Sequence, residues 1–196
     1  KEAGGVDKIT VANVGEKSTE ATLRKALAVG ADDAIRIDTT ANDAFYVAAQ
    51  LAEVAKDYDL ILAGIEASDY NGNAVGGMLA EMLDFNSVSA VSGIELEESN
   101  FKITREVDGG SQVISIGGPL VAIVQKGIAK EPRIPAMRGI MMARKKPLST
   151  KEPVEGVNKT QMISFELPPP KTACKLIDEE NANEVITLLH EEAKVL

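Results

Sequence analysis

A short apolar run followed by a polar, glycine-rich loop is the feature that most constrains the fold of this chain. Leu60 to Ala63 is wholly apolar, which is typical of a buried parallel strand, and the run stops at Gly64. A helical pattern then opens around Gly76 and Gly77. A strand, a small-residue loop and a helix start together direct backbone N–H groups at an anion. We therefore hypothesise a nucleotide phosphate here; the alternative is an ordinary loop, in which Gly and Asn supply only backbone freedom.

Two strand–helix units precede this run. Strand patterns at residues 9–14 and 34–37 alternate with two helical patterns, the first stopping at Gly30 and the second capped by Asn42 or Asp43. On the second helix, the core-facing residues that we expect are Phe45, Ala48, Ala49, Ala52 and Ala55. This order indicates an α/β fold, in which a parallel sheet with flanking helices has a Rossmann-like, adenine-nucleotide-binding arrangement.

The pattern changes after the glycine-rich loop. Strand-like runs at residues 87–96, 101–107, 112–116 and 120–124 follow one another, and turn-like segments separate the first three. We interpret them as an antiparallel hairpin extension on the parallel sheet, with the last run returning to the core after Pro119.

The last quarter of the chain has a different composition. Residues 147–172 are rich in proline and lack clear periodicity, and segments of this length without structure are rare inside a compact domain. We interpret them as an extended arm, followed by a narrow amphipathic helix at residues 178–196, although a helix that closes over the chain's own sheet would look the same. We therefore expect a nucleotide-binding domain at residues 1–148 and a C-terminal arm and helix at residues 149–196.

Composition excludes several classes of function. A net charge of −9 argues against nucleic-acid binding, and no apolar run reaches the ~18 residues that direct membrane insertion needs. One cysteine, Cys174, and one histidine, His190, leave a disulfide, a thiolate metal cluster, a Ser-His-Asp triad and a two-histidine metal site unsupported. No Rossmann or Walker glycine motif is present. The sequence therefore favours a binding scaffold without catalytic residues over an autonomous enzyme.

One segment is basic in this acidic chain. Residues 126–146 contain seven Lys or Arg and a single acidic residue, Glu131. A solvated helix with a positive last turn would explain this asymmetry, and so would a surface for an acidic partner or a phosphate-bearing cofactor. Ile140 and Met141 lie among these charges, which favours an adaptable contact surface.

Several motifs together resemble the β subunit of electron transfer flavoprotein, from about Asp7 to Leu148. They are Ala12-Asn-Val-Gly15, residues 23–32, Asp59-Leu-Ile-Leu-Ala-Gly64, Arg105-Glu-Val-Asp-Gly-Gly110, Glu131-Pro-Arg133 and Ala143-Arg-Lys-Lys146. The family normally has a further strand and helix before the residues seen here, and several acidic residues where this loop has Tyr70, Asn71 and Gly72.

The resemblance implies an electron carrier in a heterodimer with an α subunit. Such a protein takes electrons from dehydrogenases, typically the acyl-CoA dehydrogenases of fatty acid oxidation, and passes them to a membrane quinone oxidoreductase. It implies FAD held mainly by the α subunit, structural AMP in the β subunit, and a location in the bacterial cytoplasm or the mitochondrial matrix. The alternatives are an electron-bifurcating protein with a second FAD in place of AMP, or a stand-alone adenine-nucleotide enzyme or sensor.

The resemblance also implies three groups of site residues. The AMP site would comprise Val14, Gly15, Gly64, Ile65, Glu66, Ala67, Ser68, Asp69, Tyr70, Asn71, Gly72, Asn73, Ala74, Val75, Gly76, Gly77 and Met78. Arg105 and Glu106 would face the α subunit and its flavin. Docking on the partner dehydrogenase would use Met137, Arg138, Ile140, Met141, Arg144, Lys145 and Lys146.

Overall fold

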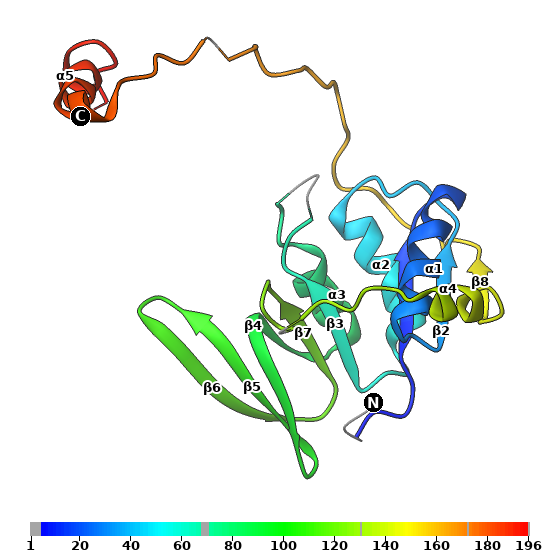
Figure 1. Cartoon of the computed structure of the whole chain (residues 1–196). Helices are drawn as coiled ribbons and strands as arrows, with labels where there is room; N and C mark the ends of the chain where they lie inside the picture. The colour runs from blue at the N-terminus through cyan, green and yellow to red at the C-terminus, as the bar shows by residue number, and fades with distance from the viewer. Residues whose placement is uncertain (1–4, 68–70, 130, 172, 196) are drawn as a thin grey trace. The chain divides into compact units, whose positions relative to one another are not determined.

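The computed structural model describes residues 5–67, 71–129, 131–171 and 173–195 of the 196. It divides the chain into two compact units, residues 1–162 and residues 163–196. The first unit is an α/β domain, and the second contains the 3-10 turn η2 (Glu179–Asn181) and helix α5 (Ala182–Glu191) (Figure 1).

Two sheets form the first unit. Sheet A is wholly parallel and contains, in spatial order, β1 (Thr10–Val14), β2 (Asp33–Ile37) and β8 (Leu148–Lys151). Sheet B contains, in spatial order, β3 (Leu60–Gly64), β7 (Leu120–Val124), β4 (Asn86–Glu97), β5 (Asn100–Val107) and β6 (Gly110–Gly117). Its first three strands are parallel, and β4, β5 and β6 form antiparallel hairpins. The parallel sheet and the hairpin extension are therefore confirmed (Figure 1).

Helices connect the strands of the parallel part. They are η1 (Lys17–Thr19) with α1 (Glu20–Val29), α2 (Ala44–Ala55), α3 (Val75–Leu83) and α4 (Met137–Ala143). Helix α1 ends at Gly30, which has a positive φ of 142°, and Asp43 caps α2 by accepting a hydrogen bond from the Tyr46 N–H, as expected. Leu23 and Leu27 of α1 are buried against Ala34 of β2 and Ala143 of α4, and they form the core beside sheet A.

Helix α2 buries only part of the expected set. Ala48 is buried as expected, together with Tyr46 and Gln50, whereas the other expected residues are only partly covered. The Tyr46 hydroxyl lies 3.1 Å from the Thr39 hydroxyl, so a polar group allows this face to be buried. Apolar periodicity alone could not identify a face whose buried residues include a tyrosine and a glutamine.

Strand β8 was not expected within the proline-rich segment. It pairs in parallel with β2 from Ala34↔Leu148 to Ile37↔Lys151, so these residues belong to the α/β domain. The following residues stay on this domain through Gln50, whose side-chain amide donates to the Val154 carbonyl at 2.8 Å and accepts from the Val154 N–H at 2.9 Å. The division of the chain after residue 162 therefore lies further along than the expected boundary at residue 148.

The Asp43 carboxylate makes a second attachment. One oxygen caps α2, and the other accepts the backbone N–H groups of Lys159 and Thr160. The hydrogen bond from the Tyr46 N–H, followed by those from Thr160 and Lys159, lowers the pKa of Asp43. The Lys159 ammonium also lies 4.9 Å from the centre of the Phe45 ring. The N-cap residue Asp43 and Gln50 of α2 thus hold residues 154–160 by hydrogen bonds.

Strand β3 departs from the expectation of a fully buried strand. It is the outermost strand of sheet B, and Leu62 is 58% exposed. The N–H of Leu120 donates to the Asp59 carbonyl, and the N–H of Ile65 donates to the Val124 carbonyl. The odd-numbered residues of β3 therefore direct their backbone N–H and C=O groups toward β7. Because backbone groups alternate along a strand, Leu62 directs its N–H and C=O to the open edge. The apolar strand was predicted correctly, but only β7 pairs with it, so the other edge of β3 has no partner strand.

Helices α1 and α4 cap each other. The Lys146 ammonium, just after α4, donates to the Leu27 and Ala31 carbonyls at the end of α1, at 2.9 and 2.5 Å. The Arg24 guanidinium of α1 donates to the Ala143 and Lys146 carbonyls at the end of α4, at 2.7 and 2.8 Å. Cations at helix C-termini satisfy carbonyls that lack a partner within the helix.

Replacement of Gln50 tests the attachment of residues 154–160. Gln50→Ala should lower the free energy of unfolding by about 1–3 kcal/mol, because it leaves both backbone groups of Val154 without their partner. Urea denaturation measures this loss. Glu53→Ala on the exposed side of α2 is the control and should stay within about 0.5 kcal/mol of the parent. Equal losses of unfolding free energy in Gln50→Ala and Glu53→Ala would contradict the attachment of Val154 by Gln50.

The neighbouring lysines Lys145 and Lys146 have different roles. Lys146 caps the end of α1, whereas Lys145 is an exposed surface charge. Lys146→Ala should destabilise the domain by about 1 kcal/mol, since it removes two charge-assisted hydrogen bonds to α1. Lys145 is exposed, and Lys145→Ala should leave the melting temperature unchanged. A thermal melt in which both variants match the parent would exclude the capping role.

Candidate functional site

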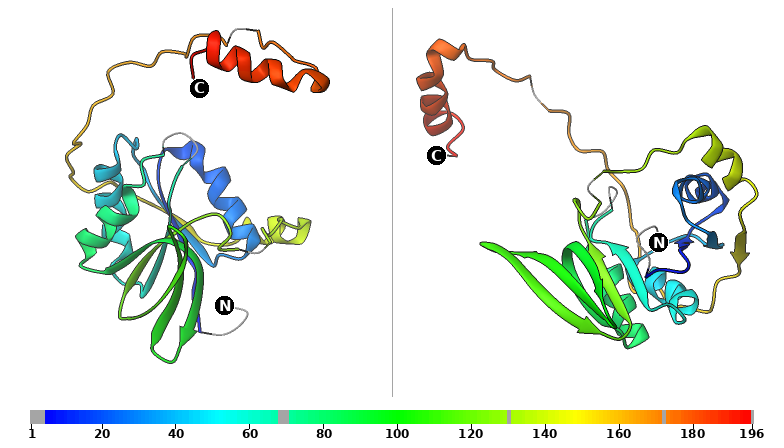
Figure 2. Two further views of the ribbon diagram at one scale, coloured as in Figure 1. Left: turned by 90° about the vertical axis from the view of Figure 1, so that its left-hand side faces the viewer. Right: turned by 60° about the horizontal axis from the view of Figure 1, so that its bottom comes forward.

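The residues expected to bind AMP follow two parallel strands. Val14 and Gly15 lie at the carboxyl end of β1, and the glycine-rich loop follows the carboxyl end of β3. Figures 1 and 2 show that both ends are on the same side of the first unit. Ligands of open α/β sheets bind at this side. The fold therefore brings the two parts of the expected site to one end of the domain.

The start of α3 offers donors and space for an anion. Its N-cap residue, Ala74, supplies no side-chain hydrogen bond, and the first intrahelical bond at this end runs from the Met78 N–H to the Ala74 carbonyl. Gly77 is exposed, and a Cβ added to it would have no heavy atom within 4 Å. Asn73 has a φ of 43°, the left-handed conformation that asparagine tolerates better than most residues. These observations fit a phosphate group at the N-terminus of α3.

Gly76 differs from Gly77 in its surroundings. A Cβ on Gly76 would lie 2.7 Å from Ile123 of β7 and 3.3 Å from Ala63 of β3. Gly76 is therefore required for the close approach of α3 to sheet B, whereas Gly77 is free of such contacts. Ser68, Asp69 and Tyr70, which belong to the expected site, lie outside the described residues.

A buried arginine that the sequence analysis did not single out holds the end of β1. Arg36 of β2 is 3% exposed, and its guanidinium donates to the Gly15 carbonyl at 3.0 Å and to Asp38 at 2.6 Å. The Arg36 Nε also lies 3.3 Å from a Glu20 carboxylate oxygen of α1. The hydrogen bond from Arg36 lowers the pKa of Asp38. A lone arginine inside an otherwise apolar strand pattern was the available signal.

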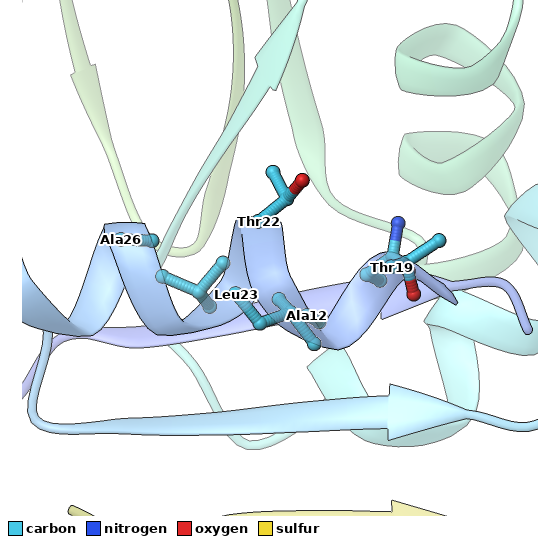
Figure 3. Close-up of a pocket in the computed structure, with 7 residues that line it drawn as sticks. Ala12, Thr19, Thr22, Leu23 and Ala26 are labelled. Carbon is cyan, nitrogen blue, oxygen red and sulfur yellow. The ribbon is translucent and has the colours of Figure 1, made fainter. Parts of the chain in front are cut away.

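A small pocket lies between β1 and α1, and no residue of the glycine-rich loop is among those that line it. It has a volume of about 230 Å³, and Figure 3 shows the small and methyl-bearing side chains around it. Its residues are Val11, Ala12, Asn13, Thr19, Thr22, Leu23 and Ala26. None of them is ionisable, so the lining offers no acid or base and nothing that would activate its threonine hydroxyls.

Arg105 and Glu106 point to opposite faces of sheet B. Arg105 pairs with Val91 and Gln112, on the face that carries Ile103, and its Nη2 lies 3.4 Å from the Ser89 hydroxyl. Glu106 pairs with Ser111, projects from the other face and is exposed. The two side chains therefore cannot meet the same partner surface side by side.

The expected docking residues lie on and beside α4. Met137, Met141 and Ile140 are exposed on this short helix, Met137 by 75%. Arg138, Arg144 and Lys145 are exposed as well. Lys146 differs, because its ammonium is engaged in capping α1. The segment thus combines flexible apolar side chains with free cations.

The described ranges contain no group of three or more His, Cys, Asp or Glu side chains placed to hold a metal ion. No helix among the described residues is both long enough and apolar enough to span a bilayer.

Comparison with known proteins identifies the family. A family model for the electron transfer flavoprotein domain matches residues 1–155. The electron transfer flavoprotein subunit beta of Syntrophomonas wolfei is 36% identical over 184 residues, which cover 92% of this chain and 72% of that protein. The Bacillus subtilis protein of the same name is 35% identical over 96% of this chain and 79% of its own length. The human one is 33% identical over 88% and 72%. This chain therefore belongs to the electron transfer flavoprotein family, as a relative of its β subunits.

Proposed function

We propose that this chain binds AMP at the N-terminus of α3 and serves an electron transfer flavoprotein whose α subunit carries FAD. The observation that supports the AMP site most directly is the uncapped start of α3 beside the exposed Gly77, at the carboxyl end of the parallel strands. The family is one of electron carriers, and the designation of its relatives as β subunits implies an α subunit as partner.

The phosphate of AMP would be held by main-chain groups. The N–H groups of Val75, Gly76 and Gly77 precede the first intrahelical donor, Met78, and the helix dipole favours an anion there. Val14 is buried at the end of β1, where it would form part of the wall of the adenine pocket. The remaining loop residues that the structure describes, from Gly64 to Ala67 and from Asn71 to Ala74, would complete the nucleotide site.

The FAD supplies the electron chemistry when it is bound to the α subunit, because it accepts and releases electrons. This chain would contribute a rigid surface to the partner. Glu106 is exposed on sheet B and would pair with an arginine of the α subunit, whereas Arg105 faces Ser89 on the opposite side of the sheet. The C-terminal arm and α5 would dock on the α subunit too.

The exposed methionines and cations of α4 would bind the electron donor. Met137 would insert into an apolar site of an acyl-CoA or related dehydrogenase, and Arg138, Arg144 and Lys145 would face its acidic groups. Electrons would then leave for a membrane quinone oxidoreductase. The bacterial cytoplasm or the mitochondrial matrix is the compartment in which such partners meet.

Substitution of Gly77 tests the AMP site. Gly77→Asp should lower the AMP released from the denatured heterodimer to well below that of the parent, because it places a negative charge beside the phosphate. The position is exposed and uncrowded, so the fold should be kept. Gly110→Asp, which adds the same charge at an open turn of sheet B, is the matched control. Unchanged AMP in Gly77→Asp would move the site elsewhere.

Substitution of Met137 tests docking on the dehydrogenase. Met137→Glu should slow electron acceptance by about tenfold or more, the loss expected when one central contact of an interface is removed. The flavin spectrum of the heterodimer should stay the same. Leu96→Glu, at an exposed residue of β4 on the face of sheet B opposite Glu106, should transfer electrons at the parent rate. Equal rates in the two variants would contradict a role of α4.

A further inference from the structure

The last hydrogen bond between β1 and β2 comes from a side chain. The two strands pair in parallel as far as Ile37, whose carbonyl accepts the Gly15 N–H at 3.0 Å. A continued ladder would bring the Thr39 N–H to the Gly15 carbonyl, but the Thr39 N–H donates to the Ile37 carbonyl instead. The Arg36 Nη1 donates to the Gly15 carbonyl at 3.0 Å. Arg36 therefore takes the place of the backbone donor that would continue the ladder.

The guanidinium of Arg36 is itself held in one orientation. The Nη1 that donates to Gly15 also donates to Asp38, after β2, at 2.6 Å. The Nε lies 3.3 Å from a carboxylate oxygen of Glu20 in α1, and the Nη2 lies 3.5 Å from the Thr150 hydroxyl of β8. Partners from four directions around a planar group fix its rotation. The position of the Gly15 carbonyl is therefore fixed as well.

These contacts argue that Arg36 is not a phosphate ligand. Arginine is a common phosphate-binding residue, and this one lies near the carboxyl ends of the parallel strands, where ligands bind. The side chain is only 3% exposed, however, and the carboxylates of Asp38 and Glu20 offset its charge. An anion that approached the guanidinium would meet both carboxylates. Arg36 can therefore act on a bound nucleotide only through the strand end that it holds.

The strand end has little room to move. A Cβ added to Gly15 would lie 2.8 Å from the Thr19 side chain and 2.9 Å from the Asn13 side chain, so Gly15 is closely packed as well as hydrogen-bonded. Val14, the residue before it, is buried. A change in the direction of the Gly15 carbonyl would consequently displace Val14 too.

We propose that Arg36 is a positioning residue of the nucleotide site, which sets the affinity for AMP by holding the Gly15 carbonyl in place of a backbone hydrogen bond. This inference rests on the proposed function, in which Val14 and Gly15 form one side of the AMP site. A site that is already in its binding geometry loses less conformational freedom when the ligand binds. An arginine with a purely structural role would raise stability but leave the affinity of the folded protein unchanged.

Exchange of bound AMP for radiolabelled AMP in the folded heterodimer tests the proposal. Arg36→Met removes every donor of the side chain and should accelerate the exchange by roughly tenfold or more, the effect of losing one charge-assisted hydrogen bond. Arg36→Lys keeps the charge beside Asp38 and should restore part of the slow exchange. Gln50→Ala is the control, since it removes two hydrogen bonds to Val154 in the same domain, and its exchange rate should stay within about twofold of the parent. Parent-rate exchange in Arg36→Met, or equal acceleration in Gln50→Ala, would overturn the proposal.

A milder substitution keeps the test decisive if Arg36→Met does not fold. Asp38→Asn alters a half-exposed partner of Arg36 and should accelerate the exchange by a few fold. Combined with Arg36→Met it should add nothing, because Asp38 acts through Arg36. Glu53→Gln, which neutralises a carboxylate paired with Lys56 on α2, is the matched control and should exchange at the parent rate. Exchange in Asp38→Asn at the parent rate, or effects of the two substitutions that simply add, would overturn the proposal. Absence of AMP from the parent heterodimer would instead contradict the proposed function.

Discussion

The buried guanidinium of Arg36 is the interaction on which the end of sheet A depends. It joins the Gly15 carbonyl after β1, Asp38 after β2 and Glu20 of α1, and its Nη2 lies 3.5 Å from the Thr150 hydroxyl of β8. A charge in this position is tolerated because two carboxylates and a carbonyl surround it, and loss of either carboxylate would reduce that compensation. Arg36 holds the Gly15 carbonyl, and the backbone pairing of Val14 and Gly15 with Ile37 completes the attachment.

A nucleotide-binding site requires that the ends of its strands and the start of its helix stay in place. Backbone donors at the start of α3 bind a phosphate only if the helix stays in place, and Gly76 secures the helix by its close approach to Ile123. Gly77, one residue later, remains open. Of the two adjacent glycines, Gly76 is needed for packing, whereas Gly77 would give the proposed phosphate access to the start of the helix.

Much of this fold follows from local patterns. Alternating strands and helices up to Gly64, and the four strands from Asn86 to Val124, were predictable because each carries its own periodicity and turns. Strand β8 was not, because Leu148 is its only apolar residue and its pairing with β2 spans more than a hundred residues. Burial of Gln50 likewise depends on a distant backbone, that of Val154. Structural features that depend on hydrogen bonds between residues distant in sequence cannot be predicted from the local pattern of apolar residues.

In the candidate site, too, the local features were predictable and the features that depend on distant residues were not. Its glycines and its place after a strand could be predicted, since they are local, but the different roles of Gly76 and Gly77 depend on what each faces. The basic segment was predicted to be either a solvated helix or a contact surface, and the engagement of Lys146 with the carbonyls of α1 could not be inferred from its charge. The opposite orientations of Arg105 and Glu106 follow from strand geometry once β5 is known.

We propose that this chain contributes an AMP-binding site to a flavoprotein heterodimer whose α subunit holds the FAD. The most direct test is to co-express the two subunits, denature the purified complex and measure the FAD and AMP that are released. We predict one FAD and one AMP for each heterodimer. Two FAD and no AMP would contradict the claim and would indicate an electron-bifurcating protein with flavin at the α3 loop. Release of neither nucleotide would exclude both functions.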